Sequence, residues 1–164
     1  MTRPSDALIR QAAEADLDAV LDLWEDLIAL HTALDERFWR KAPDGRAIMG
    51  DWLRQGLSQD DRVLLVAEVD GRVVGFAHAT FTNTSPPMVD RRVGLITDVV
   101  VSASHRRRGI GRRLMEAGIQ RLRDLDAEEI RLSVAPANEP ALALYRGLGF
   151  EVLSHTLCLW PSGD

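Results

Sequence analysis

The sequence has only one cysteine, Cys158, among its 164 residues. A single cysteine excludes an intramolecular disulfide and leaves no second thiolate for a cysteine zinc site. The four histidines show no His-x-x-x-His spacing and no neighbouring carboxylate pattern, so a catalytic metal site is not expected. We expect Cys158 to be an ordinary apolar strand residue.

Long hydrophobic runs are absent as well. No stretch reaches the ~18 apolar residues of a membrane span, and the first residues lack the apolar region of a secretory signal. We therefore expect a cytoplasmic protein that does not associate with a membrane. Aromatic residues make up only 5% and the formal net charge is −5, which argues against nucleic-acid binding.

The composition that remains is typical of a globular protein. Apolar residues account for 46% and charged residues for 27%, which is too apolar for an intrinsically disordered chain. A chain of this length can bury roughly 70% of the surface that its unfolded form exposes. We expect a single domain over residues 1–164.

Hydrophobic periodicity predicts a mixed α/β domain with one, mostly antiparallel central sheet flanked by helices. The Asp70-Gly71 pair between two β-branched runs predicts a tight antiparallel hairpin, and Asp16 is a candidate cap for the first helix. The expected strands cover residues 7–12, 63–69, 73–81, 93–102, 129–134 and 150–160. The expected helices cover residues 17–31, 36–42, 44–57, 109–125 and 138–148.

A phosphate-binding loop is predicted where an apolar strand leads into a glycine-containing helix start. The strand ends at Val101, and Gly109-Ile110-Gly111 opens the helix among the arginines at 106–108, 112 and 113. Unpaired N–H groups and a partial positive charge at a helix start favour a bound phosphate. A dinucleotide fingerprint is disfavoured because Leu114 stands where glycine or alanine is needed, and the Gly-Lys-Ser/Thr ending of a P-loop is missing.

Two motifs resemble those of the GNAT superfamily of acyl-CoA-dependent N-acyltransferases. The segment 106–111, RRRGIG, satisfies the family pattern Arg/Gln-x-x-Gly-x-Gly/Ala, although many relatives have glycine where this chain has Arg107. The segment 138–150, NEPALALYRGLGF, is similar to the pattern Asn-x-x-Ala-x-x-x-Tyr-x-x-x-Gly-Phe. Both motifs occur in the family's order, downstream of the predicted hairpin, and the resemblance extends along most of the chain.

The resemblance implies an N-acetyltransferase that moves an acetyl group from acetyl-CoA to a primary amine by direct attack in a ternary complex, without a metal. It also implies that the strand 97–101 splays away from its neighbour 130–134 and exposes main-chain groups to the pantetheine arm. The cofactor-binding residues that it implies are Val99, Val101, Arg106, Arg107, Arg108, Gly109, Ile110, Gly111, Arg112, Asn138 and Tyr145. Asn138 is also a candidate helix cap.

Tyr145 and Asp98 are the candidate catalytic residues. The resemblance implies that the phenol of Tyr145 protonates the departing thiolate, and a reference pKa near ~10 keeps that phenol protonated. Asp98 lies inside an apolar run, where strand alternation places it opposite Thr97 and Val99. It could be the base, directly or through water, or it could anchor a neighbouring loop. We expect His78 to be a structural or pocket-lining residue.

The acceptor is less well defined by the sequence. In the family its pocket is lined by the early helices and by the loop before the fourth strand, which here means His31, Asp35, Glu36, Phe38, Trp39 and the segment 83–89. Carboxylates beside aromatic rings suit an amine with an apolar body. A small amine, an amino-acid derivative, an aminoglycoside-like compound and a protein N-terminus all remain open.

Two further alternatives remain open at this point. A non-catalytic acyl-CoA-binding sensor or interaction module could use the same fold. The last expected strand could also pair between subunits, so a homodimer is one expected assembly.

Overall fold

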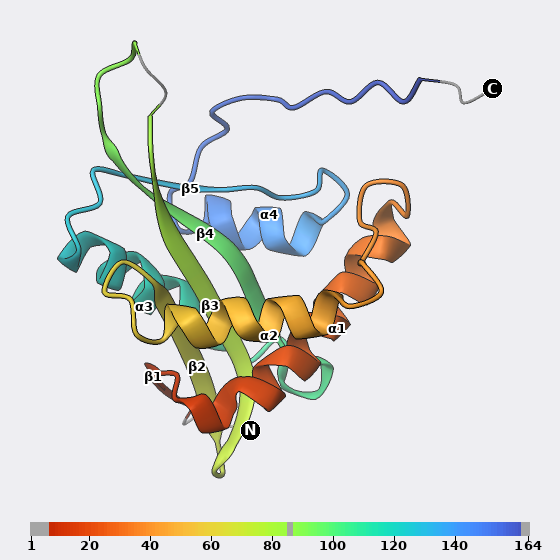
Figure 1. Ribbon diagram of the computed structural model, residues 1–164, viewed down its shortest axis with the longest axis vertical. Helices are drawn as coiled ribbons and strands as arrows, with labels where there is room; N and C mark the ends of the chain where they lie inside the picture. The colour runs from red at the N-terminus through yellow and green to blue at the C-terminus, as the bar shows by residue number, and fades with distance from the viewer. Residues whose placement is uncertain (1–6, 85–86, 162–164) are drawn as a thin grey trace.

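The computed structural model describes residues 7–84 and 87–161 (Figure 1). Its strands are β1 (Leu8–Gln11), β2 (Val63–Val69), β3 (Arg72–Asn83), β4 (Arg92–Val101) and β5 (Glu129–Leu132). Its α-helices are α1 (Leu17–Leu34), α2 (Gly45–Gly56), α3 (Ile110–Asp124) and α4 (Glu139–Arg146). Short 3-10 turns, η1 (Glu14–Asp16) and η2 (Ala103–His105), precede α1 and α3.

The described strands form one sheet in the order β1-β2-β3-β4-β5. The first three pairs are antiparallel, and β5 joins β4 in parallel. Asp70 and Gly71 connect β2 to β3 with φ values of 51° and 73°, both in the left-handed region that a two-residue hairpin turn requires. The predicted mixed, mostly antiparallel sheet and its tight hairpin are confirmed.

Helices cover both faces of the sheet (Figure 1). On one face, α1 and α2 pack against Phe76 and Val100, while α3 packs on the other face against Ala77 and Ile96. Side chains alternate along a strand, so neighbouring residues of β3 belong to different cores. His78 therefore shares the α1 and α2 face with Phe76.

A charged cluster joins β1, β2 and the start of α1. Arg10 lies 2.7 Å from a carboxylate oxygen of Asp16 and 2.8 Å from one of Glu68. The hydrogen bond from Arg10 lowers the pKa of the buried Asp16 carboxyl. Asp16 also accepts from the Ala13 N–H at 2.7 Å and makes no capping bond to α1. The expected helix cap is thus wrong, because this carboxylate is used by Arg10 and Ala13.

The expected strand at 150–160 is wrong. Residues 151–161 contain no strand, and Leu157 and Leu159 are about 92% and 87% exposed. Figure 1 shows this segment leaving the end of α4 and running outside the body of the sheet. A strand requires a hydrogen-bonded neighbour as well as apolar residues, and none of the described strands pairs with this segment.

The expected helix at 36–42 is also wrong. The segment forms a turn in which the Asp35 carboxylate accepts from the Arg37 N–H at 2.9 Å. Such a side-chain bond competes with the helical hydrogen bonds of the main chain. One helix-like bond remains, from Trp39 N–H to Asp35 C=O at 3.0 Å, before Pro43 interrupts the chain ahead of α2.

Candidate active site

The parallel pair β4 and β5 separates halfway along β4. Pairing runs from Val93 with Glu129 to Ile96 with Leu132, and β4 then continues to Val101 beside β3 alone. The Ser102 N–H donates to the Val74 carbonyl of β3 at 2.8 Å. Main-chain groups alternate in direction along a strand, so the N–H and C=O groups of Val99 and Val101 point away from β3, toward the side that β5 leaves open. The expected splayed pair is confirmed, and it leaves a strand edge next to the glycine loop.

A β-bulge interrupts β4 at Thr97. His78 pairs with Asp98 and Ala79 pairs with Ile96, so Thr97 is an extra residue in β4. Its hydroxyl lies 2.7 Å from Asp98 Oδ2 and 2.7 Å from His78 Nδ1. The expectation that Asp98 lies opposite Thr97 is therefore wrong, because the bulge brings both side chains to His78.

Asp98 is held in a mostly dry environment. Its side chain is 15% exposed, and this burial raises the pKa of the carboxyl, while the hydrogen bond from Thr97 opposes the rise. A carboxyl group with a raised pKa is a stronger base than one in water. Asp98 is thus electrostatically suited to accept a proton.

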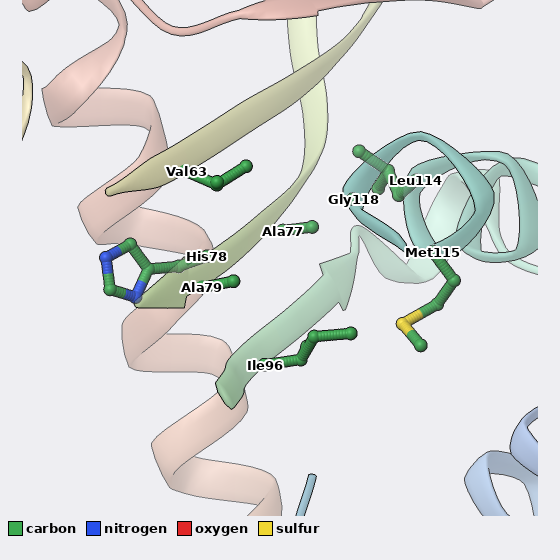
Figure 2. A pocket seen from close by; sticks show the side chains of 8 residues that line it. All are labelled: Val63, Ala77, His78, Ala79, Ile96, Leu114, Met115 and Gly118. Atoms are coloured by element: carbon green, nitrogen blue, oxygen red, sulfur yellow. The ribbon is translucent and has the colours of Figure 1, made fainter. Parts of the chain in front are cut away.

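His78 is neutral at pH 7. Its side chain is 2% exposed, and burial together with the positive charge of Arg62 lowers its pKa to about 4. Trp52 of α2 packs edge-on against the ring, with centroids 4.6 Å apart. Figure 2 shows the imidazole on the opposite side of β3 from α3.

Tyr145 approaches the same region from α4. Burial raises the pKa of its phenol, and the negative charge of Asp98 raises it further. The phenol is therefore protonated across the neutral range and can donate a proton. The side chain packs against the α3 core, and its ring meets Phe150 edge-on at 6.1 Å.

Asn138 caps the helix that carries Tyr145. Its side-chain oxygen accepts from the Ala141 N–H at 3.3 Å, as expected for an N-cap. The cap fixes the start of α4, and in this way helps to orient Tyr145.

The glycine loop has the main-chain geometry of an anion site. Gly109 lies at the N-cap of α3 with φ 79°, and its carbonyl accepts a helical hydrogen bond from the Arg113 N–H at 3.1 Å. The N–H groups of Ile110, Gly111 and Arg112 belong to the first turn of α3, where no preceding turn supplies helical acceptors. The Ile110 side chain is 1% exposed in the core, so only its N–H can face a ligand. Arg107 adopts φ 62°, a conformation that favours glycine.

The arginines of the loop have distinct surroundings. Arg106 donates to the Val101 carbonyl at 3.0 Å, which ties the loop to the end of β4. Arg112 reaches the Gly147 carbonyl at the end of α4 at 3.4 Å, and this contact links α3 to α4. Arg112 also lies 3.6 Å from the Glu116 carboxylate within α3. Arg107 and Arg108 are exposed in the same loop.

Three of the expected acceptor-side residues form a small aromatic cluster at the end of α1. His31 stacks on Trp39 with centroids 4.3 Å apart, and Phe38 meets Trp39 edge-on at 4.8 Å. Asp35 is paired with Arg37 at 3.0 Å, which reduces the negative charge available to an amine, and Glu36 is exposed. Within the expected segment 83–89, residues 85 and 86 lie outside the described residues.

A cavity between the sheet and α3 is too small to be a substrate site. It measures about 10 Å³ and has apolar walls, in part from Ala77, Ile96 and Met115 (Figure 2). This is at most the space of a single water. Within residues 7–84 and 87–161, no group of three or more His, Cys, Asp or Glu side chains could hold a metal. In the same part of the chain, no helix is long and apolar enough to span a membrane.

Sequence reasoning missed Thr97 and Trp52. Two consecutive polar residues, Thr97 and Asp98, in an otherwise apolar strand were a signal of broken alternation. Trp52 carried no comparable signal, because its contact with His78 depends on how α2 lies on the sheet.

Comparison with known proteins places this site in context. The acetyltransferase (GNAT) family model matches residues 20–150. An N-alpha-acetyltransferase from Sulfurisphaera tokodaii is 36% identical over 109 residues, which is 60% of this chain and 64% of that protein. An L-methionine sulfoximine/L-methionine sulfone acetyltransferase from Pseudomonas paraeruginosa is 27% identical over 89% of this chain and 81% of its own length.

Solved structures share the fold. A Bacillus halodurans protein has a TM-score of 0.83 at 23% identity, covering 93% of this chain and 98% of its own. An aminoglycoside N-acetyltransferase in complex with CoA has a TM-score of 0.71 at 20% identity, covering 95% of this chain and 100% of its own.

Proposed function

The chain belongs to the acetyltransferase (GNAT) family, and from this premise we propose that it is an acetyl-CoA-dependent N-acetyltransferase acting on a primary amine. The observation that carries the proposal is the open edge of β4. Main-chain groups of Val99 and Val101 there lie between the glycine loop at the start of α3 and the pair Asp98 and Tyr145.

Acetyl-CoA would lie along this edge. The N–H groups from Arg107 to Gly111 would bind its pyrophosphate, with the guanidinium groups of Arg106, Arg107, Arg108 and Arg112 supplying positive charge. Val99 and Val101 would hydrogen-bond the pantetheine arm as an added strand does, and Asn138 would add a side-chain contact. The aminoglycoside acetyltransferase of the same fold, solved with CoA, supports this assignment.

The side chains of the site supply acid and base. Asp98 would take a proton from the ammonium form of the acceptor, directly or through water, so that the neutral amine attacks the thioester carbon. The Val99 N–H would stabilise the negative oxygen that forms. As the carbon–sulfur bond breaks, Tyr145 would protonate the thiolate. The nitrogen would release its second proton to water, from which Tyr145 regains its own, and the products are an amide and free coenzyme A.

Asp98 and Tyr145 occupy suitable sides of the sheet for these roles. Asp98 lies with His78 on the face covered by α1 and α2, and the aromatic cluster of His31, Phe38 and Trp39 lies at the end of α1. Tyr145 packs with the α3 core. The amine and the cofactor would thus approach the gap between β4 and β5 from different faces.

Steady-state kinetics test the direct-transfer mechanism. We expect intersecting lines for acetyl-CoA and amine, which indicate a ternary complex, and Tyr145→Phe should lower kcat with little change in acetyl-CoA affinity. Parallel lines with an isolable acetyl-enzyme would contradict direct transfer. Unchanged kcat in Tyr145→Phe would remove the acid role from Tyr145.

The acceptor is best sought by a thiol-release screen with acetyl-CoA. The panel should contain simple amines, amino acids and their sulfone derivatives, polyamines, aminoglycosides and peptides. The names of two relatives, an N-alpha-acetyltransferase and a methionine sulfone acetyltransferase, support testing α-amino groups first. Other acyl-CoA thioesters in the same assay would define the acyl preference, for which acetyl is the proposal.

A non-catalytic acyl-CoA sensor on the same fold is the second candidate. It would be favoured if calorimetry showed tight acetyl-CoA binding while the whole amine panel gave no thiol release.

The chain spans 64% of the length of its N-alpha-acetyltransferase relative. We further propose that residues 1–164 form one acetyltransferase domain; a homodimer remains a prediction, for which sedimentation is the test.

A further inference from the structure

Three polar side chains form a continuous hydrogen-bonded chain from the interior of the sheet to Asp98. His78 Nδ1 lies 2.7 Å from Thr97 Oγ1, and Thr97 Oγ1 lies 2.7 Å from Asp98 Oδ2. His78 and Asp98 themselves are 3.9 Å apart, so the hydroxyl bridges them. The bulge makes this possible, because an ordinary strand would turn Thr97 to the opposite face from Asp98.

The direction of each hydrogen bond follows from the number of hydrogens. A threonine hydroxyl has one hydrogen to donate and can accept two bonds. An ionised Asp98 only accepts, so Thr97 must donate to it, and His78 must then donate to Thr97 from Nδ1. His78 is neutral, and this arrangement therefore requires the tautomer with hydrogen on Nδ1 and none on Nε2.

The hydroxyl has a second acceptor within reach. Thr97 Oγ1 lies 3.3 Å from the main-chain carbonyl of His78. When Asp98 holds a proton, that proton can be donated to Thr97 Oγ1, and the Thr97 hydrogen can turn to this carbonyl. His78 keeps its Nδ1 hydrogen throughout, and every donor of the chain stays satisfied in both charge states.

We propose that His78 and Thr97 are positioning residues that hold Asp98 for proton uptake, with the Thr97 hydroxyl turning between the Asp98 carboxylate and the His78 carbonyl. This inference rests on the proposed role of Asp98 as the base. The step moves one proton from the ammonium acceptor to Asp98 and leaves His78 neutral. Neither positioning residue forms a bond to the substrate.

The charged and titratable groups around the chain are compatible with this role. Arg62, whose guanidinium lies over Trp52 at 4.5 Å, disfavours an imidazolium at His78. Tyr145 faces Asp98 from α4 as a neutral phenol. Replacement of Thr97 therefore changes the hydrogen bonding of Asp98 without removing a formal charge from its surroundings.

The first test is independent of the acceptor. Nitrogen NMR of labelled histidine should show His78 as the neutral Nδ1–H tautomer, with the signal assigned by its loss in His78→Asn. The Nε2–H tautomer or a doubly protonated ring at neutral pH would overturn the proposal. Carboxyl NMR should show the Asp98 titration shifted upward by about one pH unit in Thr97→Val, the size expected from loss of one hydrogen bond to a charged group. No shift would also overturn it.

The second test is the pH profile of kcat/KM with an acceptor found by the thiol-release screen. In Thr97→Val the acidic limb should move up by about one pH unit, with about a tenfold lower kcat/KM at pH values on that limb and recovery above it. Thr97→Ser, which keeps the hydroxyl, should restore the wild-type profile. A merely structural role would lower activity at all pH values alike, and that result would contradict the proposal.

Asp98→Asn separates this inference from the proposed function. If Asp98→Asn keeps the activity and the acidic limb of the wild type, Asp98 is not the base and the proposed mechanism fails. If Asp98→Asn loses activity while Thr97→Val has the wild-type profile, the base assignment stands and the positioning proposal fails. The amide nitrogen of asparagine can replace Nδ1 as a donor, so His78→Asn should be more active than His78→Leu. Equal activity of the two variants would contradict the positioning role of His78.

Discussion

The carboxylate of Asp98 on β4 lies close enough to Tyr145 on α4 for its charge to raise the pKa of the phenol. The two residues belong to elements that do not pair with each other, and they meet where β5 leaves β4. The relationship couples the protonation states of the candidate base and the candidate acid.

Tyr145 should titrate well above an ordinary tyrosine, and this can be measured directly because it is the only tyrosine in the chain. We expect the near-ultraviolet absorbance of tyrosinate to appear at a pH higher than in a model peptide. Asp98→Asn should lower the midpoint without restoring the ordinary value, since burial is the larger cause. Tyr145→Phe should show no transition. A midpoint unaffected by Asp98→Asn would mean that the two groups are not coupled.

His78 should make folding stability dependent on pH. Its pKa is about 4 in the folded protein and near ~6.5 when unfolded, so the unfolded state binds more protons between these values. Stability should therefore fall as the pH drops from 6.5 toward 4, by about 3 kcal/mol from this group. The raised pKa of Asp98 has the opposite effect on stability. The folded state binds more protons at this carboxyl than the unfolded state, so its protonation stabilises the fold as the pH falls.

Urea unfolding at several pH values can isolate the contribution of His78. In His78→Gln, the loss of stability on acidification from pH 6.5 toward 4 should be smaller than in the wild type by about 3 kcal/mol. Parallel pH curves for the two proteins would show that His78 does not carry the effect.

Replacement of Arg10 by methionine should destabilise the fold by about 3 kcal/mol, because Asp16 is left buried without its partner. Arg54→Met is the matched control, since Arg54 pairs with exposed carboxylates and should cost less than about 1 kcal/mol. The Arg10 contribution is present above the ordinary pKa of Asp16 and should be lost as pH falls through its lowered pKa. Equal effects of the two substitutions would contradict this account.

Arg107→Gly should stabilise the protein by up to about 1 kcal/mol, because φ 62° strains any residue that has a Cβ. Arg107→Ala removes the same charge but keeps the Cβ, so the difference between the two variants isolates the main-chain effect. Thermal unfolding measures it. If the glycine variant is no more stable than the alanine variant, the loop is not strained at this position. Both variants should bind acetyl-CoA more weakly than the wild type if the Arg107 charge contributes.

Local sequence signals were sufficient for much of the fold. The Asp70-Gly71 pair specifies a turn whose geometry few other residues adopt, and the glycine loop before α3 follows from its position between a β-branched run and a helical stripe. Tyr145 and Asn138 were identified through the resemblance of residues 138–150 to the GNAT motif, which lies within a single helix and its flanking residues.

The remaining features depend on partners distant in the chain. The consecutive polar residues Thr97 and Asp98 signal a break in alternation, but the position of the bulge is defined only by the register of β4 against His78 on β3. Likewise, residues 151–161 have the composition of a strand, but a strand also needs a neighbour. Asp16 has the residue type and the position of a helix N-cap, yet its carboxylate binds Arg10, which lies on the neighbouring strand β1.

The bulge also limits how β4 can change in length. Deletion of Thr97, the extra residue, would restore regular pairing and leave Ile96 opposite Ala79 and Asp98 opposite His78, as they are now. Asp98 would stay beside His78, and Val99 and Val101 would keep their main-chain groups on the open edge, but the hydroxyl that bridges Asp98 and His78 would be lost. Deletion of Val100 would instead move Val101 into a position whose main-chain groups turn toward β3, and this would separate the base from the strand edge that is proposed to bind the cofactor.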